Sequence, residues 1–374
     1  MLKIGFDAKR LFNNFTGLGN YSRSLVSGIK KYHPENELFL FTPKIQKKED
    51  TKPFFENTYN IITPKSGSKN LWRTSKCIKD IKQNELDIYH GLSHELPIGI
   101  KNTKSKSLVT IHDLIYKTYP NDFSLIDRKI YDFKFRFACK HADKIIAVSN
   151  STKQDLIKHY HLNPEKIAVC YQTCHDMFKV ELNQDTLDSF LDHYNLPKEY
   201  MLYVGSIIER KNLLGIVQAI EKYKHKINIP LIVVGKGGKY LQQVKKYISD
   251  KNIENNILFL NPLNYLHLPA LYQKAKLFLY PSQYEGFGIP IIEALWSKTP
   301  VITTKSSSLP EAAGDGAYYC DPNSIDSIAA GIIKILNDES YANKLVSDGL
   351  NHIQQFSSER TTLELMKVYN ELVS

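Results

Sequence analysis

The chain has 374 residues, which is enough for two domains of ordinary size with a sizeable core in each. Its hydrophobic content of 42% and charged content of 24% are those of a globular protein, and no apolar run reaches the roughly 18 residues of a membrane span. The formal net charge of +10 predicts an anionic partner: nucleic acid, an anionic membrane surface or an anionic substrate. The basic residues form no single tract and no nucleic-acid-binding motif occurs, which argues against nucleic acid.

The chain opens directly on an apolar, strand-like segment, residues 1–7, which leaves no room for a signal peptide. Its five cysteines are odd in number and scattered, so we expect reduced thiols and a cytoplasmic protein. Cys170, Cys174 and His175 lie close together, but their spacing is unlike the common zinc patterns and no second pair of ligands follows. We therefore expect a strand end that enters a linker here, and no metal site.

Short apolar segments alternate with helix-like segments along the whole chain, which predicts parallel sheets with helices on both faces. The expected strands of the first half are Lys3–Ala8, Leu38–Thr42, Tyr59–Ile62, Asp87–His90, Ser107–Ile111, Lys144–Val148 and Ile167–Tyr171. Those of the second half are Met201–Val204, Pro230–Val234, Ile257–Leu260, Leu277–Tyr280, Val301–Thr303 and Ala317–Cys320. We expect an α/β fold of two doubly wound, Rossmann-like domains, residues 1–180 and residues 181–356, facing each other across a cleft.

The last segment, residues 357–374, has the pattern of a capped amphipathic helix. Ser357 or Ser358 can accept a hydrogen bond from the first free amides of that helix. The residues expected on its buried face are Leu363, Met366, Val368 and Tyr369.

A glycine-rich loop, residues 15–21, follows the first expected strand and precedes a helix. Gly17 and Gly19 predict a tight turn whose amides can face a diphosphate or an acceptor. The loop is not the dinucleotide-binding fingerprint, because Asn-Tyr-Ser follows Gly-x-Gly where that fingerprint requires a third glycine.

Two stretches, residues 65–82 and residues 128–137, carry cations interleaved with apolar side chains. Either stretch could lie against anionic lipid headgroups. Either could instead be a solvated helix face over a core, and the pattern leaves both possibilities open.

His112 and Asp113 come directly after an expected strand. A polar pair at the carboxyl end of a buried strand points into the crevice where open α/β sheets bind ligands. A histidine at such a position can also be a core residue held by its neighbours, so the residues alone leave its role open.

Arg210 and Lys211 follow the strand Met201–Val204 and a glycine turn, where a helix should begin. Fixed cations stabilise the negative charge that develops on a departing nucleoside diphosphate. No Asp-x-Asp pair, the usual metal clamp for a sugar diphosphate, occurs in the chain. We therefore expect the protein to neutralise such a leaving group without a metal or other cofactor.

The most informative segment, residues 280–293, joins an apolar strand to a helix. Gly286 and Gly288 flank Phe287 and let the backbone approach a ligand closely and take unusual φ values. Glu285 lies in the loop and Glu293 in the expected first helical turn, so both can face one crevice. Free amides at a helix start attract phosphate, and carboxylates accept hydrogen bonds from sugar hydroxyls. The segment therefore predicts a site for a sugar nucleotide.

The spacing of Glu285 and Glu293 around Glu-Gly-Phe-Gly-Ile-Pro resembles the signature of the retaining GT-B glycosyltransferases of family 4. This resemblance implies a GT-B fold whose first domain, residues 1–180, lies on the acceptor side and whose second domain, residues 181–356, binds the nucleotide sugar. The terminal helix, residues 357–374, would cross back onto the first domain and belong to it.

The resemblance implies that Glu285 holds donor sugar hydroxyls, that Glu293 holds the ribose diol, and that Arg210 and Lys211 bind the diphosphate. It further implies that His112 orients the sugar and diphosphate.

The resemblance also assigns binding roles to backbone groups. Amides near Gly17, Gly19 and residues 286–288 would face the diphosphate, and the segment from Asn261 to Leu263 would hold the nucleotide base. Two arginines common in the family are replaced here, by Ser206 after the glycine of the second-domain turn and by Asn20 in the first loop.

The implied activity is retaining transfer of a hexose from a nucleotide sugar to a hydroxyl of a glycan or lipid-linked acceptor. No residue stands out as a covalent nucleophile, and the family is usually described as using attack on the same face, with the leaving phosphate taking the acceptor's proton. The motifs look most like mannosyltransferases of surface polysaccharide assembly, such as lipopolysaccharide, which favours GDP-mannose as donor and a place on the inner face of the membrane. The alternatives are a transferase using a UDP-sugar (glucose, galactose or N-acetylhexosamine), a GT-B sugar-nucleotide epimerase, and a non-catalytic nucleotide-sugar-binding protein.

Overall fold

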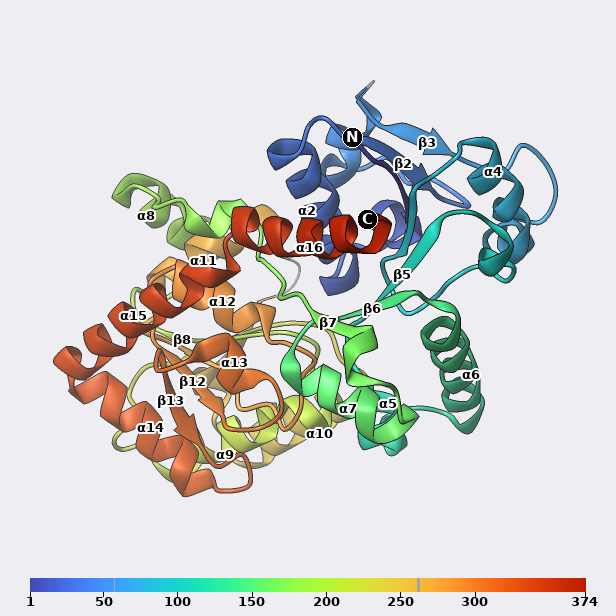
Figure 1. The fold of residues 1–374 in the computed structure, drawn as a ribbon. Coiled ribbons are helices and arrows are strands. Elements are labelled where there is room, and N and C mark those ends of the chain that lie inside the picture. Colours follow the sequence, from blue (N-terminus) through green and yellow to red (C-terminus); the bar gives the residue numbers. More distant parts are fainter. Residues whose placement is uncertain (57, 261–262) are drawn as a thin grey trace. The chain divides into compact units, whose positions relative to one another are not determined.

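The computed structural model describes residues 1–56, 58–260 and 263–374. This part of the chain forms two compact units (Figure 1). Unit 1 comprises residues 1–174 and 356–374, and unit 2 comprises residues 175–355. The chain therefore leaves unit 1 once and returns to it for its last helix.

Unit 1 contains a seven-stranded parallel sheet in the order β3-β2-β1-β4-β5-β6-β7. Its strands are β1 (Lys3–Asp7), β2 (Glu37–Phe41), β3 (Asn60–Ile62), β4 (Ile88–Gly91), β5 (Lys106–Ile111), β6 (Lys144–Ala147) and β7 (Ile167–Val169). Successive side chains of a strand point to opposite faces of a sheet. In β2, Leu38 and Leu40 accordingly enter one hydrophobic core, while Phe39 and Phe41 enter the other. Two buried faces explain why these strands read as continuous apolar runs.

Helices supply the other half of both cores of unit 1. The helices of this unit are α1 (Lys9–Asn13), α2 (Gly17–Tyr32), α3 (Lys69–Leu71), α4 (Cys77–Gln83), α5 (Ile115–Thr118), α6 (Leu125–His141), α7 (Asn150–Tyr160) and α16 (Ser358–Val373), and all but α3 contribute buried residues.

The terminal helix α16, red in Figure 1, packs against α2 within unit 1, as predicted. Ser357 is its N-cap and accepts a hydrogen bond from the Arg360 amide. The expectation for Leu363 was wrong, because this side chain is 45% exposed. Thr362 is buried instead, facing Gly28 of α2, where an added Cβ would lie 2.4 Å from the Thr362 hydroxyl oxygen. The absence of a side chain at Gly28 lets the two helices approach closely.

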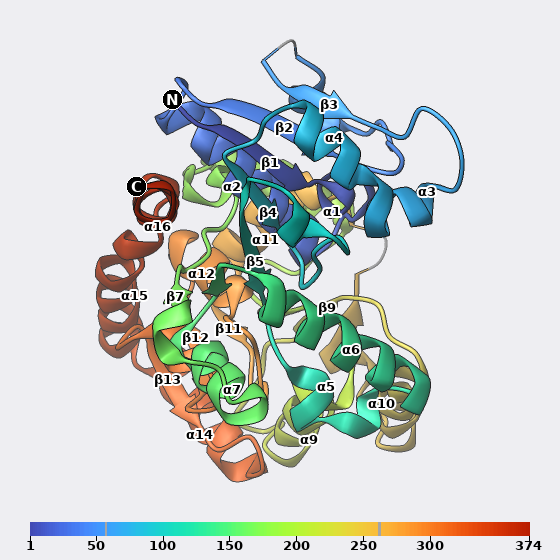
Figure 2. The ribbon, with the colours of Figure 1, turned by 45° about the vertical axis from the view of Figure 1, so that its right-hand side comes forward.

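Unit 2 contains a six-stranded parallel sheet in the order β10-β9-β8-β11-β12-β13. Its strands are β8 (Met201–Val204), β9 (Leu231–Val234), β10 (Ile257–Phe259), β11 (Leu277–Leu279), β12 (Val301–Thr304) and β13 (Ala317–Cys320). Its helices are α8 (Gln184–Tyr194), α9 (Leu213–Lys222), α10 (Lys239–Asp250), α11 (Leu268–Lys274), α12 (Ile289–Trp296), α13 (Leu309–Ala313), α14 (Ile325–Asn337) and α15 (Glu339–Ile353). Helices α9 and α14 lie side by side over one hydrophobic core (Figure 2).

All thirteen predicted strands are present, with ends shifted by at most two residues, and both sheets are doubly wound as expected. The order of each sheet reverses once, between β1 and β4 in unit 1 and between β8 and β11 in unit 2. In open α/β sheets, ligands bind outside the carboxyl ends of the strands at such a switch point. Each unit therefore has its own natural ligand crevice.

The two stretches in which cations alternate with apolar side chains differ in how far those apolar side chains are buried. In residues 65–82, Trp72 and Ile81 are buried, so this stretch is largely a solvated face over a core. In α6, by contrast, Leu125, Ile126 and Phe133 are 71%, 72% and 67% exposed. Within the described residues, no helix has both the length and the apolar character needed to span a bilayer.

We predict that Gly28→Ala lowers the free energy of unfolding by about 1–3 kcal/mol, because the added methyl group would overlap Thr362 between α2 and α16. Gly17→Ala in the same helix is the matched control, since a Cβ there meets no atom within 4 Å. That control should change the free energy by less than about 1 kcal/mol. Urea unfolding measures both, and equal effects would contradict this account of the helix pair.

Candidate functional site

The residues expected to bind a nucleotide sugar converge at the switch point of unit 2. Arg210 and Lys211 belong to a single 3₁₀ turn (Glu209–Lys211) in the connection from β8 to α9. Glu285 lies in the connection from β11 to α12. These two connections leave the carboxyl ends of neighbouring strands, which is why residues 74 positions apart meet.

One oxygen of Glu285 is the centre of this cluster. Arg210 Nη1 lies 3.0 Å and Lys211 Nζ lies 3.2 Å from Glu285 Oε1. The hydroxyl groups of Tyr280 and Ser282 each donate a hydrogen bond to the same oxygen at 2.9 Å. Among the described residues, no hydrogen bond is formed with the other oxygen, Oε2.

The backbone around Glu285 is fixed from the neighbouring strand as well. The Glu285 amide donates to the Ser307 hydroxyl at 2.8 Å, and the Ser308 hydroxyl donates to the carbonyl oxygens of Glu285 and Phe287 at 2.8 and 2.9 Å. Ser307 and Ser308 follow β12, so the loops after three adjacent strands are joined.

The glycines of this loop have different backbone requirements. Gly288, at the N-cap of α12, has a φ of 119°, which side-chain-bearing residues rarely adopt. Gly286 is absent from the described residues with positive φ, so the expectation of an unusual φ holds for Gly288 alone. Pro290 is the second residue of α12, whose first residue is Ile289.

The charges of the cluster keep Glu285 ionised. Burial alone would raise the pKa of this carboxyl, but Lys211 and Arg210, with the Ser282 and Tyr280 hydrogen bonds, lower it to about 2. The carboxylate is therefore negative at any physiological pH. It also offsets part of the positive charge that the two cations would present to a bound anion.

Glu293 has the opposite electrostatic environment. It lies in the second turn of α12, one turn later than expected, and is 6% exposed. Burial raises its pKa to about 7, which a 3.2 Å hydrogen bond from the Tyr272 hydroxyl and the charge of Lys211 only partly offset. Its remaining hydrogen-bonding capacity suits a ligand that brings donors of its own.

Sequence reasoning missed Tyr272, because an aromatic residue in the apolar helix α11 looks like an ordinary core residue. Asn261 and Pro262, expected near the nucleotide base, lie outside the described residues. Leu263 is half-buried and begins the segment that leads to α11.

In unit 1, His112 follows β5 and is buried, with both ring nitrogens bonded. Its Nε2 lies 2.9 Å from the Leu92 carbonyl oxygen, and its Nδ1 lies 3.2 Å from Gln172 Nε2. Because a carbonyl oxygen only accepts, Nε2 carries the proton and Nδ1 is an acceptor. Burial lowers the pKa of His112 to about 4, so the ring is neutral at pH 7.

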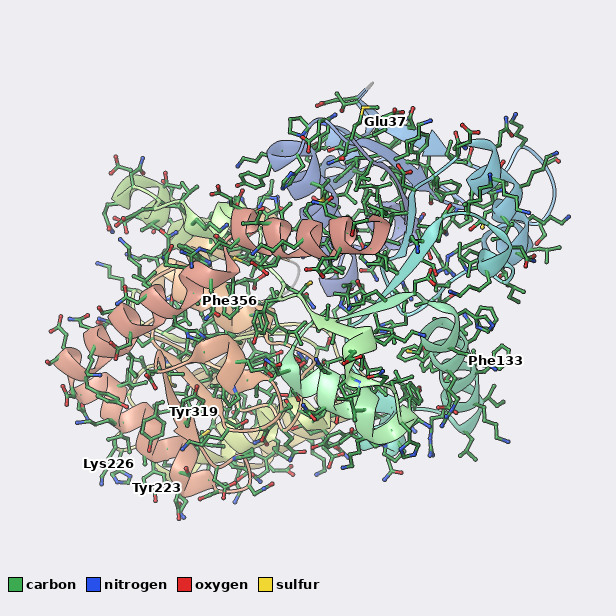
Figure 3. The ribbon with its side chains drawn as sticks, in the orientation of Figure 1. Glu37, Phe133, Tyr223, Lys226, Tyr319 and Phe356 are labelled. Carbon is green, nitrogen blue, oxygen red and sulfur yellow. The ribbon has the colours of Figure 1, made fainter. Side chains whose placement is uncertain are left out.

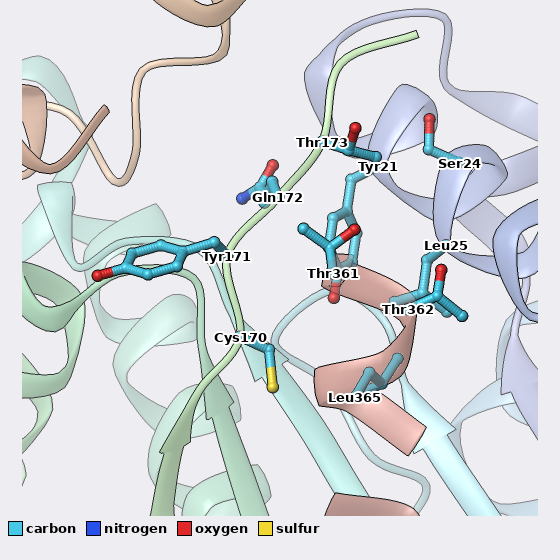
Figure 4. A pocket seen from close by; sticks show the side chains of 10 residues that line it. All are labelled: Tyr21, Ser24, Leu25, Cys170, Tyr171, Gln172, Thr173, Thr361, Thr362 and Leu365. Atoms are coloured by element: carbon cyan, nitrogen blue, oxygen red, sulfur yellow. The ribbon is translucent and has the colours of Figure 1, made fainter. Parts of the chain in front are cut away.

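Gln172 and Tyr21 also line a small cavity beside α16 (Figure 4). Its volume of about 30 Å³ is enough for one or two water molecules. The cavity is therefore too small for a sugar or a nucleotide.

The glycine-rich segment of unit 1 is the start of α2, rather than the expected tight turn, and Gly17 is its first residue. The Gly19 amide is already bonded, to the Thr16 carbonyl oxygen at 2.9 Å and to Asn14 Oδ1 at 3.1 Å. An added Cβ at Gly19 would lie 1.7 Å from the Asn14 carbonyl oxygen. Gly19 is thus required for close backbone packing, and its amide does not project freely.

Asn20, which stands where relatives often have Arg, has its side-chain oxygen 2.5 Å from Arg23 Nη2. It therefore helps to hold the start of α2 in place. Among the described residues, no group of three or more His, Cys, Asp or Glu side chains is arranged to hold a metal ion.

Comparisons with known protein families agree with this geometry. Residues 15–174 match the model of Glycosyltransferase Family 4, and residues 192–352 match that of Glycosyl transferases group 1. The chain belongs to this family of glycosyltransferases.

Two curated relatives of this glycosyltransferase are named as mannosyltransferases. O-antigen chain mannosyltransferase B of Escherichia coli is 28% identical, covering 99% of this chain and 100% of the relative. O-antigen chain mannosyltransferase RfbU of Salmonella typhimurium is 28% identical, covering 65% of this chain and 63% of the relative.

Solved structures share the fold of this glycosyltransferase. A glycosyltransferase from Rickettsia africae gives a TM-score of 0.78 at 21% identity, covering 100% of this chain and 99% of that one. HepE of Anabaena, solved with UDP and glucose, gives 0.76 at 16% identity, covering 99% and 100%. WaaG, described as involved in lipopolysaccharide biosynthesis, gives 0.71 at 16% identity, covering 99% of each chain. These likenesses confirm the predicted GT-B fold.

We predict that Glu293→Gln stabilises the protein at pH 8 but not at pH 5. The pKa of Glu293 in the folded protein, about 7, exceeds the ordinary value of 4.5, which the unfolded chain should have. Between these two pH values the native state therefore binds more protons than the unfolded state, and the protein loses stability as the pH rises. The uncharged amide removes this loss, on the order of 2–3 kcal/mol, which corresponds to a rise of roughly 5 °C in the melting temperature.

Thermal unfolding of both proteins at pH 5 and pH 8 tests this. At each pH, the melting temperature of the parent is subtracted from that of Glu293→Gln. This difference reports on position 293, because the two proteins share every other titrating group. A variant that is less stable than the parent by the same amount at both pH values would contradict the raised pKa.

Proposed function

We propose that this glycosyltransferase is a retaining, metal-independent hexosyltransferase that moves mannose from GDP-mannose to a glycan or lipid-linked acceptor in surface polysaccharide synthesis. The observation that carries the proposal is the convergence of Arg210 and Lys211 on one oxygen of Glu285 at the switch point of unit 2. The names of the O-antigen mannosyltransferase relatives support mannose as the sugar.

The cations would stabilise the leaving diphosphate. The Lys211 side chain is 13% exposed. Its ammonium group lies 3.2 Å from Glu285 Oε1 and donates a 2.5 Å hydrogen bond to the Tyr280 hydroxyl. Such partly buried charges act more strongly than the same charges in water, and they are positioned before the reaction begins. The backbone of residues 286–288 at the start of α12 would add the dipole of a helix N-terminus.

The two carboxylates would hold different parts of the donor. Glu285 Oε2, which has no described protein partner, would accept hydrogen bonds from hydroxyls of the transferred sugar. Glu293, deprotonated above about pH 7, would accept hydrogen bonds from the ribose diol. Tyr272 would orient the Glu293 carboxylate through its own hydroxyl.

His112 would act as a neutral acceptor. With its proton on Nε2 and committed to Leu92, Nδ1 would exchange its 3.2 Å contact with Gln172 for a hydroxyl of the donor sugar. Because burial lowers the pKa of His112 to about 4, the ring would stay neutral at pH 7 and would not need to change its charge during the reaction.

Retention of the anomeric configuration fits a reaction in which the acceptor hydroxyl attacks the sugar from the face on which the phosphate leaves. The leaving phosphate oxygen takes the proton of the acceptor hydroxyl as the new glycosidic bond forms and the bond from sugar to phosphate breaks. The cations offset the charge left on the diphosphate. This route requires neither a covalent nucleophile from the protein nor a metal.

We further propose that the exposed side of α6 lies on an anionic bilayer at the inner face of the membrane. Phe133, labelled in Figure 3, and the exposed Leu125 and Ile126 would enter the headgroup region, beside the exposed cations Lys129 and Lys140. The net charge of +10 is complementary to such a surface.

We expect the protein to bind phosphatidylglycerol vesicles, and this binding to weaken as the salt concentration rises. Failure to bind these vesicles would remove this part of the proposal.

A second donor class follows from the structural likeness to HepE, which was solved with UDP and glucose. In a UDP-sugar-dependent enzyme, the cluster around Glu285 would serve the same roles. Only the contacts to the base would differ.

We predict that, in excess EDTA, the enzyme releases GDP from GDP-mannose faster than it releases UDP from UDP-glucose, UDP-galactose or UDP-N-acetylglucosamine. The product formed with a neutral mannose oligosaccharide should have the α configuration of the donor, read by NMR. Lys211→Met should lower kcat about 100- to 1,000-fold, because one fixed donor of the leaving-group site is lost.

The matched control is Lys246→Met in the same unit, since Lys246 is 76% exposed and pairs with Asp250 on its own helix. It should retain the parent rate. A Lys211→Met enzyme within threefold of the parent would overturn the diphosphate site, inversion of the anomeric centre would overturn retention, and faster release of UDP would favour the second donor class.

A further inference from the structure

A cavity of about 620 Å³ lies in unit 1 at the edge of the sheet where the strands begin. It is bordered by Asp87, directly before β4, by Lys106, the first residue of β5, by the end of α4, and by Val373, the last residue of α16. In open α/β sheets the crevice at the switch point lies at the other edge, outside the carboxyl ends of the strands. The cavity is therefore separate from that crevice, and its volume is within the range of small-molecule sites, about 300–1,000 Å³.

The floor of this cavity is apolar and firmly packed. Ile81 and Leu86 are 0% and 4% exposed and belong to one hydrophobic core of unit 1. Val373 packs against the other core. The shape of the floor is thus set by close-packed elements of the fold.

The rim of the cavity carries three lysines, Lys82, Lys104 and Lys106. All three are exposed, and in the described part of the chain none of them forms an ion pair, although Glu85 and Asp87 border the same cavity. Like charges gathered around one hollow raise its positive potential and attract anions. The rim therefore suits an anionic group that lies between the three ammonium groups.

A buried hydroxyl group also borders the cavity. Ser105 is 9% exposed, and its hydroxyl forms no hydrogen bond with any residue that the structure describes. A buried polar group without a partner is unfavourable unless water or a ligand supplies the missing hydrogen bond. Ser105 is thus a second sign of a ligand, independent of the lysines.

The backbone at Glu85 is strained. Glu85 follows Asn84, the C-cap of α4, and has a φ of 52°, in the left-handed region where glycine or asparagine is usual after a helix. Its amide donates to the Lys82 carbonyl oxygen at 3.2 Å, which helps to hold this conformation. Strain of this kind occurs often at residues that hold ligands. Here it accompanies a carboxylate at the border of the cavity.

The groups that border the cavity determine which ligand suits it. Ammonium groups and the Ser105 hydroxyl are donors that match the oxygens of a phosphate. Glu85 and Asp87 can accept hydrogen bonds from hydroxyl groups, and the apolar floor can pack on C–H groups.

Two features favour a hexose phosphate over other phosphates. The cavity is larger than a phosphate ion alone requires, and its carboxylates would repel such an ion if no hydroxyl groups came between. Among the described residues that line it, none is aromatic, so a nucleotide base would have no ring on which to stack.

We propose that this cavity binds a hexose phosphate, with the phosphate held by Lys82, Lys104 and Lys106 and the ring hydroxyls held by Glu85 and Asp87. The assignment does not depend on the proposed glycosyl transfer, because it uses none of the residues of the donor site. Since Val373 forms part of the wall, the bound ligand would also hold the last turn of α16 in place.

Calorimetric titration of the full chain with mannose 1-phosphate, mannose 6-phosphate and glucose 6-phosphate tests this proposal. We expect at least one of them to bind about tenfold or more tightly than inorganic phosphate, because only the ester also contacts the carboxylates and the floor. Lys82→Met should weaken that binding about tenfold, since a charge-assisted hydrogen bond is lost. Ser105→Ala should weaken it as well, by a smaller factor.

The matched control is Lys79→Met. Lys79 lies on the same helix as Lys82, is exposed, forms no ion pair among the described residues and lies outside the cavity lining. The control removes the same charge, so it should change the affinity by no more than about twofold. Equal weakening by Lys79→Met and Lys82→Met would overturn the proposal.

A further variant separates this cavity from the donor site of unit 2. Lys211→Met should bind the hexose phosphate as tightly as the parent does. If Lys211→Met loses that binding and Lys82→Met keeps it, the ligand occupies the donor site and the proposal is overturned. Equal affinity for inorganic phosphate and for every hexose phosphate would mean an adventitious ion only, and no binding at all would also overturn the proposal.

Hexaglutamate is titrated in parallel. If it binds more tightly than every hexose phosphate, and Lys82→Met weakens its binding, the cavity belongs to an acidic polypeptide and the proposal is overturned.

Discussion

The buried carboxylate of Glu285, shared by two cations, is the constraint on which the site of unit 2 depends. A charge so far removed from water is stable only when its partners stay in place, and removal of one partner of a buried pair typically costs about 3–5 kcal/mol. Arg210, Lys211, Tyr280 and Ser282 all meet the same oxygen. The loops after β8 and β11 are thereby held together, and Ser307 adds the loop after β12.

The same physical solution occurs in both units. In each, a parallel sheet reverses its strand order once, and buried acids and cations from distant segments pair at the carboxyl ends of the two central strands. Glu285 with Arg210 and Lys211 forms this cluster in unit 2, and Asp7 with Arg73 does so in unit 1. The sheet brings the backbones to one edge, and the ion pairs then fix the loops.

The strands could be predicted because they are buried on both faces and therefore read as short apolar runs between turn residues. The same reasoning predicted that Arg210, Lys211 and Glu285 lie in connections at the carboxyl ends of strands, and the structure has them there. It failed where packing between distant segments decides the outcome. Leu363 is exposed because Gly28 admits Thr362 instead, and Tyr272 looks like any core aromatic residue until Glu293 is placed beside it.

Backbone detail was also beyond sequence reasoning. Glycine permits many conformations, so a glycine-rich segment does not reveal which one is adopted. Gly19 serves close packing and Gly288 serves a positive φ. The pairing of Asp7 with Arg73 spans 66 positions, and no local pattern indicates it.

The most direct test of the central claim is calorimetric titration of the parent and of Glu285→Gln with GDP and with GDP-mannose in EDTA. If Glu285 holds the sugar while offsetting the two cations, the variant should bind GDP at least as tightly as the parent does, because more positive charge faces the diphosphate. It should also bind GDP-mannose no more tightly than GDP. Equal loss of affinity for both ligands would contradict the account and leave Glu285 with a purely structural role.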